Sequence, residues 1–228
     1  MVKQLKRLVP ARVKRSAKEV LSERRLSRVL RRISQLPEGE LPSRELLHEL
    51  QVGWGNDGFA ARYDYLEEVI DMATRTSGPI LECGSGLTSL LLGLYAGRRN
   101  VQTWSLEHIP EWRTRVTATL QRYRISGVDV RLAPLREYGD FQWYDPPIDA
   151  LPETFSLIVC DGPPGTIQGG RYGLLPVLGT RLGADTLILL DDADREAETE
   201  VLSRWASERN MRVTLRTAPT GAFALVTC

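Results

Sequence analysis

Cysteine is scarce in this sequence and is not spaced as in a metal site. The chain has three cysteines, Cys83, Cys160 and Cys228, and the first two fall inside segments expected to be buried strands. An odd number with irregular spacing argues against a disulfide framework. The pattern favours small buried side chains in a reducing compartment.

Long apolar runs, internal repeats and low-complexity segments are also missing. No run reaches the ~18 apolar residues of a membrane span. The first residues lack the apolar core and small-residue cleavage site of a secretory signal. These features predict a cytoplasmic protein, and 228 residues suffice for one substantial domain with an extension.

Charge is unevenly divided along the chain. Residues 1–35 carry twelve Lys or Arg and two Glu, whereas the rest holds 18 basic and 27 acidic residues. Ser16 and Glu19 suggest a capping box for a helix that runs to about Ile33 and has one apolar side. That helix would either lie peripherally on the anionic inner membrane surface or pack on its own domain or a homodimer mate. No aromatic residues interleave these charges, so no nucleic-acid partner is expected.

The segment from residue 37 to residue 77 is predicted to form a helical cap and a lead-in helix. Pro37 to Pro42 is a linker, and Ser43 caps a short helix expected to end at Leu50. Residues 53–56 then form a loop whose Trp54 is either a mobile lid or a buried plug. An amphipathic helix follows over residues 59–76, with apolar side chains at Phe59, Tyr63, Leu66, Ile70 and Ala73.

The central stretch begins with a strand from Ile80, a Gly-x-Gly turn at Gly84 and Gly86, and a helix from Leu87 to Ala96. Glycines let the backbone turn sharply and approach a ligand, and a helix N-terminus presents unpaired N–H groups to it. Glu107 ends the next strand, where an acid accepts hydrogen bonds from a ribose. The unit therefore predicts a nucleoside site.

Two residues favour S-adenosylmethionine over a nicotinamide dinucleotide. Glu82 precedes the glycines, where its carboxylate would repel a pyrophosphate and suit a cationic amino-acid group. A dinucleotide motif also expects Gly or Ala at the position held by Ser89.

Alternating strands and helices continue to the end of the chain and predict a parallel sheet with helices on both faces. A long aromatic connection over 133–153 is expected to shape a substrate pocket or cover a sheet edge. The predicted strands are 128–132, 155–160, 186–190 and a hairpin of 211–216 with 222–226; the predicted helices are 110–124, 172–182 and 195–209.

Acids end two of these strands. Asp161 follows one strand, and Asp191 and Asp192 follow its expected neighbour. Clustered carboxylates repel unless one is protonated or a cation joins them, and oxygen ligands suit Mg²⁺ or another divalent cation. Alternatively, Asp161 alone is functional and the other two cap the next helix.

With these motifs, the sequence resembles the class I S-adenosylmethionine-dependent methyltransferases over about residues 78–228. The resemblance implies a Rossmann-like seven-stranded, mostly parallel sheet of order 3-2-1-4-5-7-6. It also implies cofactor contacts from Glu82, Gly84, Ser85, Gly86, Glu107 and His108. Members of that family often have an acid after the third strand, whereas this sequence has Ala133-Pro134-Leu135 there.

Within that family the chain is similar to the metal-dependent catechol-type O-methyltransferases, in a bacterial branch. Asp161, Asp191 and Asp192 match their metal ligands, but Pro164 stands where they have a lysine base. Asp161 is then the first candidate for the catalytic base and His108 the second. Candidate substrate contacts are Arg171, Tyr172 and Trp143.

The sequence thus predicts three parts, a basic extension (1–36), a helical cap and lead-in (37–77) and a methyltransferase domain (78–228). The expected reaction is methyl transfer to a hydroxyl of a small molecule or glycan. The alternatives are N-methylation, a nicotinamide-dependent oxidoreductase and a non-catalytic cofactor-binding scaffold.

Overall fold

The computed structural model describes residues 17–55, 61–219 and 221–227. Its central element is a seven-stranded sheet of order β3-β2-β1-β6-β7-β9-β8. The strands are β1 (Ile80–Cys83), β2 (Thr103–Glu107), β3 (Val128–Leu132), β6 (Phe155–Cys160), β7 (Leu182–Leu190), β8 (Arg212–Ala218) and β9 (Gly221–Thr227). Strands β3, β2, β1, β6 and β7 pair in parallel, and β9 pairs antiparallel with β7 and β8. Counting only these strands, this is the predicted order 3-2-1-4-5-7-6, and the α/β fold is confirmed.

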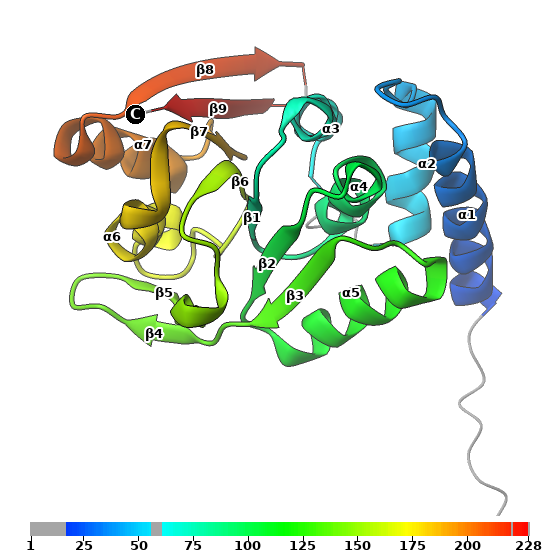
Figure 1. The fold of residues 1–228 in the computed structure, drawn as a ribbon, viewed down its shortest axis with the longest axis horizontal. Helices are drawn as coiled ribbons and strands as arrows, with labels where there is room; N and C mark the ends of the chain where they lie inside the picture. The colour runs from blue at the N-terminus through cyan, green and yellow to red at the C-terminus, as the bar shows by residue number, and fades with distance from the viewer. Residues whose placement is uncertain (1–16, 56–60, 220, 228) are drawn as a thin grey trace, which may run out of the picture.

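Helices cover both faces of the sheet (Figure 1). On one face lie α3 (Tyr63–Arg75), α4 (Leu87–Tyr95) and α5 (Pro110–Tyr123), and on the other α6 (Leu174–Leu178) and α7 (Glu196–Arg209). Side chains alternate between the two cores along each strand. In β6, Leu157 and Val159 join the core under α3 and α4, while Ile158 and Cys160 join the core under α6 and α7.

The N-terminal helices form a pair against the first core. Helix α1 (Ala17–Ser34) packs on α2 (Arg44–Trp54), as Figure 1 shows. The apolar side of α1 is buried there through Leu26, Val29, Leu30 and Ile33. Packing on its own domain is therefore the alternative that the structure supports for this apolar side. Ser16 lies outside the described residues.

Ser43 caps α2 as predicted, accepting a hydrogen bond from Leu46 N at 3.3 Å. The helix does not end at Leu50, however, but continues to Trp54 and is closed by Gly55 in a left-handed conformation. The predicted loop over 53–56 is wrong for Gly53 and Trp54. Trp54 is buried, and the guanidinium of Arg115 lies 4.5 Å from its ring centre. Asn56 and Phe59 lie outside the described residues.

Further elements differ from their predicted bounds. Helix α3 begins at Tyr63, and β7 begins at Leu182 rather than at residue 186. The helix predicted over 172–182 is instead two short 3₁₀ turns, η3 (Gly170–Gly173) and η4 (Gly179–Arg181), on either side of α6. Gly173 and Gly179 border a five-residue helix because glycine weakens a longer one.

The aromatic connection folds into a hairpin of β4 (Leu135–Glu137) and β5 (Gln142–Tyr144), followed by the 3₁₀ turn η2 (Ile148–Ala150). Figure 1 places it beside α6, away from α3 and α4. One further 3₁₀ turn, η1 (Gly97–Arg99), follows α4. Within the described residues, no helix has the length and apolar character to cross a membrane.

Candidate active site

A cavity of about 420 Å³ opens where β1, β2, β6 and β7 end. Open α/β sheets bind ligands in the crevice outside the carboxyl ends of their strands, and the volume is that of a small-molecule site. The lining includes the predicted residues Gly84, Ser85, Gly86, Glu107, His108, Asp161, Arg171, Asp191 and Asp192.

The glycine turn after β1 forms one wall of the cavity. Gly84 has φ of +91°, and a Cβ there would lie 3.2 Å from Gly162 N, so the turn after β1 touches the turn after β6. A Cβ at Gly86 would meet no protein atom within 4 Å. The space beside Gly86 is therefore open to a ligand.

Glu107 ends β2 and faces this turn. Its Oε2 accepts hydrogen bonds from Ser85 N at 3.2 Å and Ser85 Oγ at 2.8 Å, and its Oε1 accepts one from Ile109 N at 2.9 Å. His108 Nδ1 lies 3.3 Å from Oε1. Burial alone would raise the pKa of Glu107, but His108, Ile109 N and Ser85 outweigh it and lower the pKa. The cavity thus contains a fixed carboxylate with acceptor capacity left for a ligand.

Glu82 does not line the cavity. Its side chain is buried between β1 and α4, where it accepts hydrogen bonds from the hydroxyls of Thr88, Ser89 and Ser105. Burial raises the pKa of Glu82 to about 7, although these hydroxyls oppose the shift. Glu82 fixes the start of α4 against the sheet, and direct contact with a cofactor stays a prediction.

Asp161, Asp191 and Asp192 converge as predicted, with one carboxylate oxygen of each within 4.8 Å of the others. Partial burial raises the pKa of Asp161 to about 6, which Arg171 opposes and Asp192 reinforces. Burial, with Asp161 and Asp192 nearby, raises the pKa of Asp191 to about 8. Burial and mutual repulsion thus raise the pKa of both carboxyl groups, so the cluster favours retaining a proton near neutral pH.

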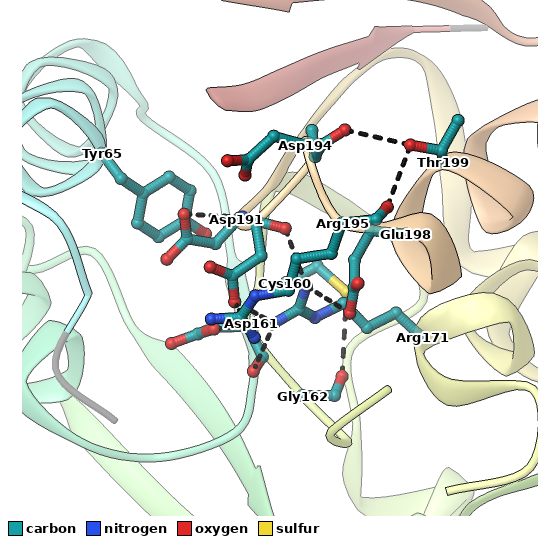
Figure 2. A network of polar contacts seen from close by, with 12 residues as sticks. Tyr65, Cys160, Asp161, Gly162, Arg171, Asp191, Asp194, Arg195, Glu198 and Thr199 are labelled. Carbon is teal, nitrogen blue, oxygen red and sulfur yellow. Dashed lines mark hydrogen bonds and ion pairs between the residues drawn. The ribbon is translucent and has the colours of Figure 1, made fainter. Parts of the chain in front are cut away.

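Arg171 supplies the positive charge at this cluster. Its Nη2 lies 2.9 Å from Asp161 Oδ1 and 3.2 Å from Asp192 Oδ2, and its Nη1 donates to the carbonyl of Asp191 at 2.7 Å. Figure 2 shows the guanidinium among groups from the ends of β6 and β7 and the start of α7. Two more arginines contact Asp192, with Arg195 Nη1 at 2.8 Å from Oδ2 and Arg62 Nη2 at 3.5 Å from Oδ1.

These contacts decide how well the cluster suits a divalent cation. A metal needs oxygen atoms that face a common point. Here Arg171 already bridges Asp161 and Asp192, and its side chain is 2% exposed. A cation would have to displace a buried guanidinium, so the residues as arranged do not fit a divalent ion.

Two of the predicted substrate residues lie elsewhere. Trp143 is buried and packs over Gly173, and Tyr172 donates to Glu208 at 2.5 Å; neither lines the cavity. Tyr144, next to Trp143, does line it. The aromatic connection thus lines the cavity through Tyr144, and its role toward a substrate stays a prediction.

The lining also includes charged and aromatic residues that sequence reasoning did not propose as site residues, among them Arg62, Trp112, Tyr144 and Arg195. Trp112 lies in the first turn of α5, shortly after the end of β2, and its Nε1 donates to Ser85 O at 2.6 Å. Arg62 bonds Asp194 from 132 positions away. No local pattern around Arg62 indicates that contact.

No protein-family model matches the chain, and no curated protein matches its sequence. Solved structures match its fold. A protein from Staphylococcus aureus assigned as a caffeoyl-CoA O-methyltransferase superposes with a TM-score of 0.61 at 10% identity, covering 89% of this chain and 99% of that one. A methyltransferase from Geobacter sulfurreducens gives 0.57 at 11% identity, covering 88% and 96%. Cofactor-bound Rv0187 from MTB gives 0.55 at 15% identity, covering 95% and 92%. The chain has the Rossmann-like methyltransferase fold.

Proposed function

We propose that the protein is an S-adenosylmethionine-dependent methyltransferase acting on a hydroxyl group of a small molecule or glycan. The observation that carries the proposal is Glu107. It is an ionised carboxylate held by Ser85 and Ile109 N at the end of β2, facing a cavity with open space beside Gly86. Ribose hydroxyls are donors that suit this acceptor, and the fold shared with solved methyltransferases supports the same reading.

When bound, S-adenosylmethionine would supply a methyl group from its sulfonium, with the electron pair of the broken bond staying on the sulfur. The protein's part is to position the acceptor and take up its proton. Asp161 suits the proton step because its carboxylate faces the cavity, and partial burial raises its pKa to about 6. Arg171 fixes the position of that carboxylate, because its Nη2 lies 2.9 Å from Asp161 Oδ1.

We infer that the acceptor binds at the part of the cavity where charged side chains gather. Arg62, Asp192 and Arg195 lie there together, with Asp192 between the two guanidiniums. Such a wall favours a hydroxylated or charged acceptor over an apolar one. Methylation of an amino group on a similar acceptor is the alternative reaction, and a scaffold that binds the cofactor without turnover is the alternative function.

Calorimetric titration of S-adenosylhomocysteine into the full chain tests the proposal. Micromolar binding is expected for the wild type. Glu107→Ala should weaken it about 100-fold, because each hydrogen bond to a charged group contributes roughly 1.5–3 kcal/mol. Glu111→Ala, an exposed acid in the first turn of α5, is the matched control and should bind normally. Absence of binding by folded wild type would refute the proposal.

Helix α1 suggests where the enzyme acts. Its buried side leaves Arg24, Arg25 and Arg28 exposed on the opposite side, and we propose contact between these arginines and anionic lipid. Removing the helix would uncover α2, so the better test is co-sedimentation with phosphatidylserine vesicles of the full chain and of a variant with all three changed to Glu. Equal pelleting of the two proteins would refute the contact.

A further inference from the structure

The hydroxyl of Tyr144 is buried and has no hydrogen-bond partner among the residues that the structure describes. Tyr144 nevertheless lines the cavity. Leaving a buried hydroxyl unpaired is costly, and folded proteins seldom do so unless a ligand or water completes the bond. A ligand bound in the cavity is therefore a candidate partner for this hydroxyl.

The position of this hydroxyl is defined by two neighbours. A Cβ on Gly162 would come within 2.5 Å of Tyr144 Oη, so the oxygen lies against the turn after β6. The ring of Tyr144 lies 5.9 Å from that of His108, the residue after Glu107. Tyr144 thus lies beside the residues proposed to hold the nucleoside.

The backbone holds Tyr144 firmly in place. Tyr138 Oη donates to the carbonyl of Tyr144 at 3.1 Å, and Asp145 N donates to the carbonyl of Pro134 at 2.8 Å. The adjoining Trp143 packs against Gly173 in η3. The hairpin is therefore docked on both sides of Tyr144, and the residue is held in place before any ligand binds.

Tyr144 also offers the cavity a hydrogen-bond donor. The hairpin that begins at Leu135 returns to the cavity with Tyr144. Burial raises the pKa of Tyr144 well above its ordinary value, so its hydroxyl remains a neutral donor.

We propose that Tyr144 is a cofactor-positioning residue whose Oη donates a hydrogen bond to an acceptor atom of the adenosyl group. This inference rests on the proposed function, because it names a further contact with the same cofactor. The hydroxyl contributes binding and orientation, and takes no part in the proton step.

Tyr144→Phe removes the hydroxyl alone and gives opposite effects on stability and binding. The free variant should unfold at the same temperature as the wild type or higher, since it loses an unpaired buried polar atom. Its affinity for S-adenosylhomocysteine should fall about 5- to 20-fold. Its affinity for 5′-methylthioadenosine, which lacks the amino-acid end, should fall by the same factor.

Tyr95→Phe is the matched control, because its hydroxyl donates to Glu40 O at 3.2 Å and lies outside the cavity. It should lose a little stability and no affinity. Unchanged binding of both probes to Tyr144→Phe would overturn the inference, and so would a loss restricted to S-adenosylhomocysteine, which would place the contact at the amino-acid end. A wild type that binds neither probe would instead refute the proposed function.

Discussion

Arg171 and Glu198 form an ion pair in which both side chains are 2% exposed, with Nη1 2.9 Å from Oε1. Arg171 comes from η3 and Glu198 from the first turn of α7, so the pair joins two segments behind the acid cluster. The same guanidinium contacts Asp161 and Asp192. The orientation of the proposed base therefore depends on a residue that does not line the cavity.

Glu198→Gln should destabilise the protein by about 2 kcal/mol, because it weakens a buried hydrogen bond between charged groups while Arg171 keeps its contacts with Asp161 and Asp192. Urea unfolding followed by circular dichroism measures this loss. The control is Glu200→Gln, an exposed position on the same helix, which should change stability by less than about 0.5 kcal/mol. Equal unfolding midpoints for the two variants would contradict the role assigned to the pair.

Chelation should have no effect on this protein. Arg171, Arg195 and Arg62 already supply positive charge to Asp161 and Asp192, so a divalent cation is not needed to relieve their repulsion. We expect the same unfolding temperature and S-adenosylhomocysteine affinity in EDTA and in millimolar Mg²⁺. If adding Mg²⁺ raised the affinity for S-adenosylhomocysteine, a metal ion would have to displace the arginines from these carboxylates.

The two glycines of the turn should respond differently to alanine. Gly84→Ala requires a strained positive φ and places a methyl group against Gly162, so it should cost at least ~1 kcal/mol of stability as well as cofactor affinity. The methyl group added in Gly86→Ala meets no protein atom. This variant should therefore keep the wild-type unfolding temperature but bind the cofactor more weakly. Thermal unfolding and calorimetry on both variants separate these effects. Wild-type affinity in Gly86→Ala would show that the ligand does not approach this wall.

The strands of the sheet could be predicted because the residue pattern that marks each strand lies within the strand itself. Strand β6 was predicted with its observed bounds, and acids that end parallel strands must meet at one edge. The hairpin of β4 and β5 was missed because each strand has three residues, too few to show alternation. The partners of Arg171 and Arg62 were not predictable either, since Asp191 lies 20 positions away and Asp194 132 positions away, and only the fold brings them together.

Stability should fall as the pH rises from about 4.5 to 7. Glu82 has a folded-state pKa of about 7 against an ordinary value of 4.5. The stabilisation from protonated Glu82 is fully present below the unfolded-state pKa and is lost as the pH rises through the folded-state pKa. This loss lowers the free energy of unfolding by on the order of 3 kcal/mol. Asp161 and Asp191 act in the same direction. Urea unfolding at pH 5 to 8 measures the slope, which Glu82→Gln should reduce; an unchanged slope would show that Glu82 is ionised throughout.

The pH dependence of cofactor binding tests Asp161 without knowledge of the acceptor. S-adenosylmethionine and S-adenosylhomocysteine differ in the methylated, positively charged sulfur, so the ratio of their affinities reports the charge near that atom. As pH rises through about 6, Asp161 loses its proton, and its carboxylate should attract the sulfonium. The preference for S-adenosylmethionine should then increase roughly 5- to 10-fold between pH 5 and 8, as expected for unit charges several ångströms apart in a partly buried site.

Asp161→Asn should remove most of this pH dependence while preserving S-adenosylhomocysteine binding, because the sulfur of S-adenosylhomocysteine is an uncharged thioether. Asp194 pairs with Arg62 at 3.0 Å and does not line the cavity, so Asp194→Asn is the matched control and should keep the dependence. A ratio that stays constant with pH in the wild type would place the sulfonium away from Asp161. The proton acceptor would then have to be sought at His108, the other titratable side chain proposed as a base, which lines the same cavity.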